Sequence, residues 1–270
     1  VYRPRPSWAE MDALDWWRAT CQTVQQAIAQ SGIGPEEIAG VGVDGLSGAP
    51  VPVDVTGEPL CRVPIWQDRR SQEEADGLKI LPEASYLINL NPNPLDPAHS
   101  TSKVLWLANR QPELFEAVYR FLPSSGFIVQ KLTGEFTCDH TQAFDYHFFD
   151  ARQARWDQKA ADVIGVPLDK FPPLYQSCDI VGTITGPAAA ATGLSEGTPV
   201  IAGGLDACVG SLGVGVARLG QTVDQGGQAG GMALVLDHVI VEPRLMFTHH
   251  VVPGRFLLHS GTVGGGSLRW

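Results

Sequence analysis

One carboxylate, Asp206, follows an apolar run that leads into Gly203, Gly204 and Leu205. Glycines permit the close approach of a ligand or of another backbone segment, because they carry no side chain. A carboxylate at such a turn can take the proton of a substrate hydroxyl and so act as a general base. Alternatively, Asp206 only caps the helix that is expected to follow it. The residues by themselves leave both interpretations open.

Two glycine-rich segments, residues 224–231 and 261–267, are candidate phosphate-binding loops. Successive backbone N–H groups in such a loop can form a concave site for an anion. Neither segment contains the Gly-Lys-Ser/Thr sequence of a Walker loop, so a simple hairpin turn is the alternative for each. The candidate contacts are Gly226, Gly227 and Gln228 in the first segment and Gly265 and Gly266 in the second.

Residues 65–70 bring together Trp66, Asp68 and two arginines. The face of a tryptophan ring can stack on the C–H groups of a polyhydroxylated ligand, while a nearby carboxylate and guanidinium bind its hydroxyls. The segment is therefore a candidate sugar-binding site. The alternative is an ion-paired strand end on the surface.

The 270-residue chain is 44% hydrophobic, which is enough for one large domain or two modest ones. Its net charge is −10, and no basic block runs along it. Nucleic-acid binding and anionic-membrane binding both need clustered lysine and arginine, so neither partner is predicted. A charged fraction of 18% argues against disorder, and no apolar run approaches the roughly 20 residues that a membrane-spanning helix needs.

The five cysteines are dispersed, without the Cys or Cys/His spacing of a zinc site. An odd, scattered set indicates buried apolar thiols in a reducing environment, so a cytoplasmic location is expected. His249 and His250 are adjacent, and neighbours in a strand point to opposite faces. No protein-bound metal site is therefore predicted.

Helices and strands must position these segments, and the residue pattern predicts both in alternation. Apolar positions recur from Trp8 at the three-to-four spacing of an amphipathic helix, expected over Trp8–Ser31 and ended by Gly32. Parallel strands that alternate with helices indicate an α/β fold with ligands at the strand ends. The other expected helices are residues 100–110, 112–119, 124–133, 156–164, 188–192 and 209–216, and the expected strands are 38–43, 51–54 and 199–202.

Six short segments are modest alone but specific in their order and spacing. They are residues 38–43 (IAGVGV), 53–60 (VDVTGEPL), 65–70 (IWQDRR), 102–107 (SKVLWL), 131–135 (KLTGE) and 193–200 (GLSEGTPV). In this order they resemble the FGGY carbohydrate kinases, which include xylulokinase, ribulokinase and glycerol kinase. The resemblance, from about Ser7 to Trp270, implies two actin-like (ribonuclease-H-like) domains, each a mixed sheet flanked by helices, that close over a sugar and ATP.

The resemblance also implies an activity and roles for individual residues. The activity is ATP- and Mg²⁺-dependent transfer of a phosphoryl group to a sugar hydroxyl. Asp206 falls on the family's catalytic aspartate, which favours the general-base interpretation. Gln228 and Ala229 stand where the family usually has Thr and Ser, so a hydroxyl contact to phosphate is lost. The implied substrate contacts are Ser47, Gly48, Trp66, Asp68 and Ala207, and the implied nucleotide contacts are Gly226, Gly227, Gln228, Gly265 and Gly266.

The expected acceptor depends on Ser47, Gly48 and Ala98. Glycerol kinases carry Arg-Glu at the first two positions and Tyr at the third, and xylulokinases carry Met-His at the first two. Ribulokinases often have an acid like Asp44 and an Asp-Ala pair like that at position 206. Small residues leave room for a larger acceptor, so we predict a pentulose such as xylulose or ribulose, or another polyol.

The family is typically roughly twice as long as this chain, which implies a piece of a larger kinase. Residues 1–216 would form most of the amino-terminal, sugar-binding domain without its first strands, and residues 217–270 would begin the nucleotide-binding domain. Such a piece is expected to bind ATP poorly, and a homodimer is compatible with the sequence. Two alternatives are a non-catalytic sugar-binding relative, suggested by Gln228 and Ala229, and an actin-like phosphotransferase that acts on an acid or amide.

Overall fold

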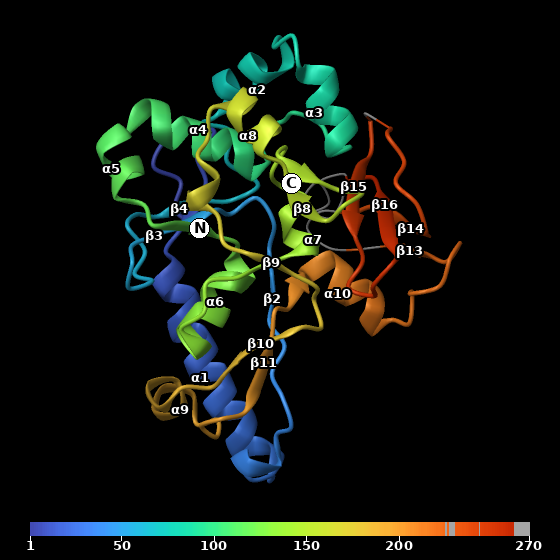
Figure 1. Cartoon of the computed structure of the whole chain (residues 1–270). Helices are drawn as coiled ribbons and strands as arrows, with labels where there is room; N and C mark the ends of the chain where they lie inside the picture. The colour runs from blue at the N-terminus through green and yellow to red at the C-terminus, as the bar shows by residue number, and fades with distance from the viewer. Residues whose placement is uncertain (225, 227–229, 243, 262–270) are drawn as a thin grey trace.

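The computed structural model describes residues 1–224, 226, 230–242 and 244–261, and it has the mixed α/β fold that the sequence predicts (Figure 1). The helices are α1 Ala13–Ser31, α2 Gln72–Lys79, α3 Ala84–Leu90, α4 Ser100–Arg110, α5 Pro112–Ala117, α6 Ser124–Thr133, α7 His140–Ala143, α8 Gln158–Ile164, α9 Gly186–Thr192 and α10 Asp206–Gly213, with 3-10 turns at Pro35–Glu37 and Leu168–Lys170.

The strands are short, and they pair both parallel and antiparallel. Pairs β12–β2 and β6–β9 are parallel, whereas β1–β4, β3–β5, β7–β8 and β10–β11 are antiparallel. The strands are β1 Glu10–Met11, β2 Asp44–Gly45, β3 Val51–Val53, β4 Val63–Pro64, β5 Arg120–Leu122, β6 Cys138–Asp139, β7 Phe149–Asp150, β8 Arg155–Trp156, β9 Leu174–Tyr175, β10 Ile180–Thr183, β11 Pro199–Ile201, β12 Gly204–Leu205, β13 Thr222–Asp224, β14 Met232–Leu236, β15 Met246–His249 and β16 Phe256–His259.

Helix α1 begins five residues later than its apolar pattern predicts, at Ala13 instead of Trp8. The Asp12 side chain accepts a hydrogen bond from the Leu14 N–H at 2.9 Å, which caps the helix, and the preceding residues form β1 instead. The helix ends at Gly32 in the left-handed conformation, as expected. Among the described residues no helix, α1 included, has both the length and the apolar character needed to cross a bilayer.

The other predicted helices and strands agree with the structure in some places and differ from it in others. Helices α4 and α6 match the predicted residue ranges. The strand predicted over residues 38–43 is reduced to one parallel bridge between Val41 and Val200, followed by β2. The helix predicted over residues 209–216 begins earlier, at Asp206. Glycines weaken strands and lack side chains to pack, and both errors fall in glycine-rich sequence.

The carboxy-terminal strands form one antiparallel sheet in the order β13-β14-β16-β15, drawn in orange and red in Figure 1. Its residues Ala233, Val235 and Leu257 pack against Phe144 and Leu205, so the sheet shares a core with the rest of the chain. In the first pair Asp224 lies opposite Met232, so the two strands are antiparallel neighbours. Residues 225 and 227–229 of the glycine-rich segment between them lie outside the described residues, so the hairpin turn and the phosphate loop both stay predictions.

The cysteines are free, and their burial differs from one to the next. Cys138 and Cys208 are buried, Cys21 and Cys61 are half-buried, and Cys178 is exposed. The prediction of buried thiols is thus correct for two of them and wrong for Cys178. Within the described ranges, no group of three or more His, Cys, Asp or Glu residues is placed to hold a metal ion.

Three histidines are shielded enough for their pKa values to fall: His147 and His259 are buried, and His249 is half-buried. Burial lowers the pKa of His147 to about 3, that of His249 to about 4 and that of His259 to about 4. The unfolded chain takes up protons on these rings below pH about 6.5, while the folded chain does not. Asp139 has the opposite effect on stability, because burial raises its pKa to about 7 and the folded chain therefore gains stability as this carboxylate is protonated. It is one group against three histidines.

We therefore expect the thermal midpoint to fall as the pH decreases from 7 to 5. Thermal unfolding followed by circular dichroism measures this change. His249→Asn should reduce the difference between the two pH values, whereas His238→Asn, at an exposed position, should leave it unchanged. A midpoint that is equal or higher at pH 5 would contradict the prediction.

Candidate active site

Asp206 is placed by two parallel strands that end together. In the β12–β2 pair, Gly204 lies opposite Asp44, and the Gly204 N–H donates to the Val43 carbonyl at 3.0 Å. Gly203 has a φ of +81°, and a Cβ there would collide with the same Val43 carbonyl. The glycines predicted to permit close approach therefore serve the packing of one strand on the other. Asp206 follows at the carboxyl end of β12, close to the end of β2.

The Asp206 carboxylate is exposed and accepts a 2.7 Å hydrogen bond from the Ala207 N–H. The N-cap of α10 is Leu205, so Asp206 is the first residue of the helix and not its cap. Partial desolvation, followed by the negative charge of Asp44, raises the pKa of Asp206 above the ordinary aspartate value. A carboxylate that is exposed and more basic than usual is suited to accept a proton.

The loop after β2 brings together three of the residues singled out from the sequence. Gly48 has a φ of +62°; a Cβ there would collide with the Ala98 carbonyl and lie 3.0 Å from the Trp66 Cα. The loop therefore packs directly on the chain at Trp66 and Ala98. The idea that small residues leave room for a larger acceptor is wrong for Gly48, because its neighbours fill that space. Ser47, the preceding residue, is half-buried, as is Trp66.

A buried carboxylate that the sequence analysis missed, Asp145, holds this loop in place. Its Oδ2 accepts hydrogen bonds from the Gly48 N–H and, at 3.1 Å, from the Ser100 hydroxyl. Its Oδ1 lies 2.9 Å from His99 Nδ1. Lys103, also buried, donates to the Ala98 carbonyl. A run of polar residues on the buried face at the start of α4, Ser100 to Lys103, was the available signal for this network.

Asp68 is not where a sugar-binding residue should be. It is fully buried; its Oδ2 accepts a 2.5 Å hydrogen bond from the Ala9 N–H, and the two oxygens accept from Arg70 at 2.8–2.9 Å. The surface ion-pair alternative holds for Arg69, which pairs with Asp96 at the surface, whereas the Asp68–Arg70 pair lies inside the protein. Both oxygens of Asp68 are engaged, so in this structure it supports the Trp66 segment from within.

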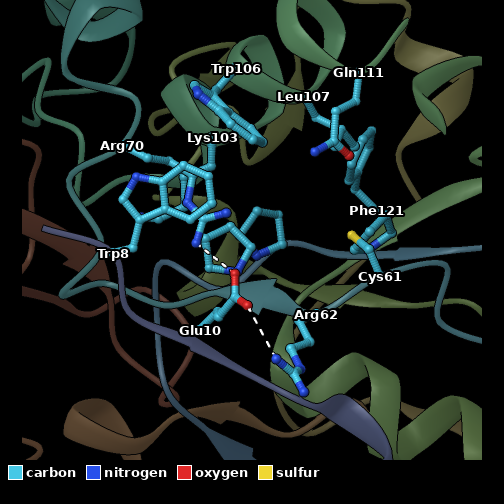
Figure 2. Close-up of a pocket in the computed structure, with 13 residues that line it drawn as sticks. Trp8, Glu10, Cys61, Arg62, Arg70, Lys103, Trp106, Leu107, Gln111 and Phe121 are labelled. Carbon is cyan, nitrogen blue, oxygen red and sulfur yellow. Dashed lines mark hydrogen bonds and ion pairs between the residues drawn. The ribbon is translucent and has the colours of Figure 1, made fainter. Parts of the chain in front are cut away.

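Arg70 lines a cavity of about 270 Å³ that is separate from Asp206 (Figure 2). Its guanidinium lies 3.6 Å from the centre of the Trp8 ring and 5.2 Å from that of Trp106, in cation–π geometry. Glu10 pairs with Arg70 at 2.7 Å and with Arg62 at 3.7 Å. Neither Asp206 nor the loop of Ser47 and Gly48 lines this cavity. Asp206 is exposed on the surface of the chain.

The residues expected to contact nucleotide can be placed only in part. Gly226 follows β13 and is exposed. Gly227, Gln228, Gly265 and Gly266 lie outside the described residues.

Asp68→Ala should destabilise the protein, because it leaves the buried Arg70 without one of its two carboxylate partners. We expect the free energy of unfolding to fall by about 3 kcal/mol in urea denaturation. The matched control is Asp76→Ala, which breaks an exposed ion pair with Lys79 and should change it by less than about 1 kcal/mol. The prediction is contradicted if Asp68→Ala is as stable as this control and no longer binds sugar. That result would indicate that Asp68 is a substrate ligand.

Comparison with known proteins finds sugar kinases among the relatives of this chain. The chain is 26% identical over 273 residues to the xylulose kinase of Escherichia coli K12, covering 100% of the chain and 55% of that protein. It is 28% identical over 271 residues to the autoinducer-2 kinase of Enterobacter sp. 638, covering 98% of the chain and 51% of that protein. The chain therefore spans about half the length of these curated relatives.

Solved structures and the family match lead to the same assignment. The crystal structure of the xylulose kinase of Rhodospirillum rubrum superposes with a TM-score of 0.91 at 26% identity, over 100% of this chain and 56% of that one. The family described as "FGGY family of carbohydrate kinases, N-terminal domain" matches residues 1–213. Residues 1–213 match the N-terminal domain of that family, and the chain therefore belongs to the FGGY family of carbohydrate kinases.

Proposed function

We propose that the complete gene product that contains this chain transfers the terminal phosphoryl group of ATP to a hydroxyl of a small sugar. The observation that carries the proposal is the position of Asp206. It is an exposed carboxylate of raised pKa at the ends of two parallel strands, beside the loop of Ser47 and Gly48. Membership of a carbohydrate kinase family supports the same reaction class.

In the proposed step, the acceptor hydroxyl oxygen attacks the γ-phosphorus of ATP, the bond to the bridging oxygen breaks, and ADP leaves. The hydroxyl proton passes to the Asp206 carboxylate. Phosphoryl transfer depends mostly on positioning and charge neutralisation, so one base at the acceptor is the main covalent chemistry that the protein must supply. The raised pKa of Asp206 makes it a better proton acceptor than an ordinary surface aspartate.

The acceptor would lie between Asp206 and the loop that Gly48 anchors. Trp66 offers a ring face, Ser47 a hydroxyl and Ala207 a small side chain near the base. Asp68 acts on this site through Arg70 and the Trp66 segment. Because Asp206 faces an open surface here, the closed, water-excluding cleft that such a reaction needs is proposed to form with further protein and with bound nucleotide.

ATP and Mg²⁺ are the proposed cofactors. Mg²⁺ usually keeps several waters and is held by one or two carboxylates together with substrate phosphates. The ion would be held mainly through the nucleotide phosphates and would neutralise their charge. The glycine turn after β13, including Gly226, Gly227 and Gln228, is proposed to contact phosphate through backbone N–H groups, with Gly265 and Gly266 as further contacts.

The proposed acceptor is a pentulose such as xylulose or ribulose. The names of two relatives, xylulose kinase and autoinducer-2 kinase, support a small polyhydroxylated acceptor without choosing one. An ADP-release assay over pentuloses, hexuloses and linear polyols tests the choice. Sugar binding without ADP release would favour a non-catalytic relative, and turnover of a linear polyol alone would favour another polyol kinase.

Asp206→Asn should lower kcat of the complete gene product by about 100-fold or more, because general-base catalysis typically contributes that much. The affinity for sugar, measured by calorimetry, should change by less than about threefold, since the amide keeps the shape of the carboxylate. Asp162→Asn, at an exposed position on α8, is the matched control and should retain wild-type turnover. Equal kcat values for the two variants would reject Asp206 as the base.

The 270-residue chain by itself should bind ATP weakly, because it spans only about half the length of its curated relatives. Isothermal titration of this chain with Mg-ATP measures the affinity. A clean dissociation constant in the micromolar range would show that its residues suffice for nucleotide binding.

A further inference from the structure

The short helix α7 lies between the two strand ends that carry the proposed reaction. It follows β6, and the carboxylate of Asp139, at the end of β6, caps it by accepting from the N–H groups of Thr141 at 2.9 Å and Gln142 at 3.1 Å. The sequence of this segment gives no sign of a functional role, since it contains neither glycines nor an ion pair. In the fold, α7 contacts β12, which leads to Asp206.

The first contact runs through the Thr141 hydroxyl. The Leu205 N–H donates to Thr141 Oγ1 at 2.7 Å, and this hydroxyl in turn donates to Asp139 Oδ1. The Leu205 amide can only donate, so the Thr141 hydroxyl must accept from it. The hydroxyl hydrogen then points to the Asp139 carboxylate, to which it donates a hydrogen bond. Leu205 directly precedes Asp206. The position of the proposed base is therefore fixed by β2 on one side and by Thr141 on the other.

The second contact runs through the side chain of Gln142. Its Nε2 donates to the Gly45 carbonyl at 3.1 Å and to the Leu46 carbonyl at 3.4 Å. These two residues lead directly into Ser47 and Gly48. Two consecutive residues of α7 thus hold the base on one strand and the acceptor loop on the other, so the separation of base and acceptor depends on one short helix.

Asp139 carries an energetic cost in this arrangement. It is 1% exposed, and its Oδ2 is buried without a hydrogen-bond partner among the described residues. Burial raises its pKa to about 7. All three hydrogen bonds that it accepts from Thr141 and Gln142 fall on Oδ1, which caps α7 and orients the Thr141 hydroxyl, while Oδ2 carries the cost of burial.

We infer that Asp139, Thr141 and Gln142 are positioning residues, which set the distance and direction between Asp206 and the sugar-binding loop. Thr141, supported by Asp139, acts on the base, and Gln142 acts on the acceptor loop. The inference rests on the proposed function, because it assigns these residues to the same reaction.

The test separates the two contacts in the complete gene product. Thr141→Val removes the hydroxyl and should lower kcat by about tenfold, with the KM for sugar within about threefold, because small displacements of a reacting group are costly. Thr141→Ser keeps the hydroxyl and should restore kcat. Gln142→Met removes the amide and should raise the KM for sugar instead. If Thr141→Val does not fold, Thr141→Ala takes its place.

The matched control is Thr192→Val, which removes a fully buried hydroxyl that donates to the Ala188 carbonyl of α9 at 2.7 Å. A structural role alone predicts that Thr141→Val and Thr192→Val lose similar stability and keep similar kcat, and this result would overturn the inference. In an Asp206→Asn background, Thr141→Val should cause little further loss of kcat. A full additional loss would also overturn it.

A measurement without turnover separates this inference from the proposed function. In the 270-residue chain, ¹³C NMR titration of the Asp206 carboxyl should give a lower pKa in Thr141→Val, because a displaced carboxylate is better solvated. Thr192→Val should leave it unchanged. If the wild-type gene product transfers no phosphoryl group, the proposed function fails, and this titration still decides whether Thr141 positions Asp206.

Discussion

The parallel contact between β2 and β12 is the constraint on which the site depends. Gly203 passes so close to the Val43 carbonyl that no side chain fits between them, and the Gly204 N–H completes the pairing. Since parallel strands end on the same side, this contact delivers Asp206 and the Ser47–Gly48 loop to one edge of the fold. The chemistry at that edge is an outcome of backbone packing, and the side chains that surround it serve to keep the two strand ends aligned.

Buried polar groups maintain that alignment at a cost in stability. Asp145 accepts a hydrogen bond from the Gly48 N–H. Asp68 pairs with Arg70, whose guanidinium lies beside the Trp8 and Trp106 rings. Burying a charge is unfavourable unless hydrogen bonds and opposite charges compensate, and removing one partner is worse than never burying the pair. These groups therefore fix the geometry of the loops more than they stabilise the fold.

The sequence predicts the mixed α/β fold, the helices with regular apolar spacing, and the approach of glycine backbones near Asp206. It does not reveal the buried partners of Asp68, because a carboxylate beside tryptophan and arginine looks the same whether it faces a ligand or a buried guanidinium. It misses Asp145 and Thr141, since their partners, Gly48 and Leu205, are 97 and 64 residues away along the chain. Long-range hydrogen bonds leave no local pattern, whereas helices and turns do.

The packing of Gly48 limits how this site can evolve. Its positive φ and its contacts with Ala98 and Trp66 leave no space for a side chain in this backbone conformation. A larger residue at position 48 therefore requires a different path of the loop and a shift of the chain at Ala98 and Trp66. A change of acceptor at this position is thus a change of backbone as well as of side chain.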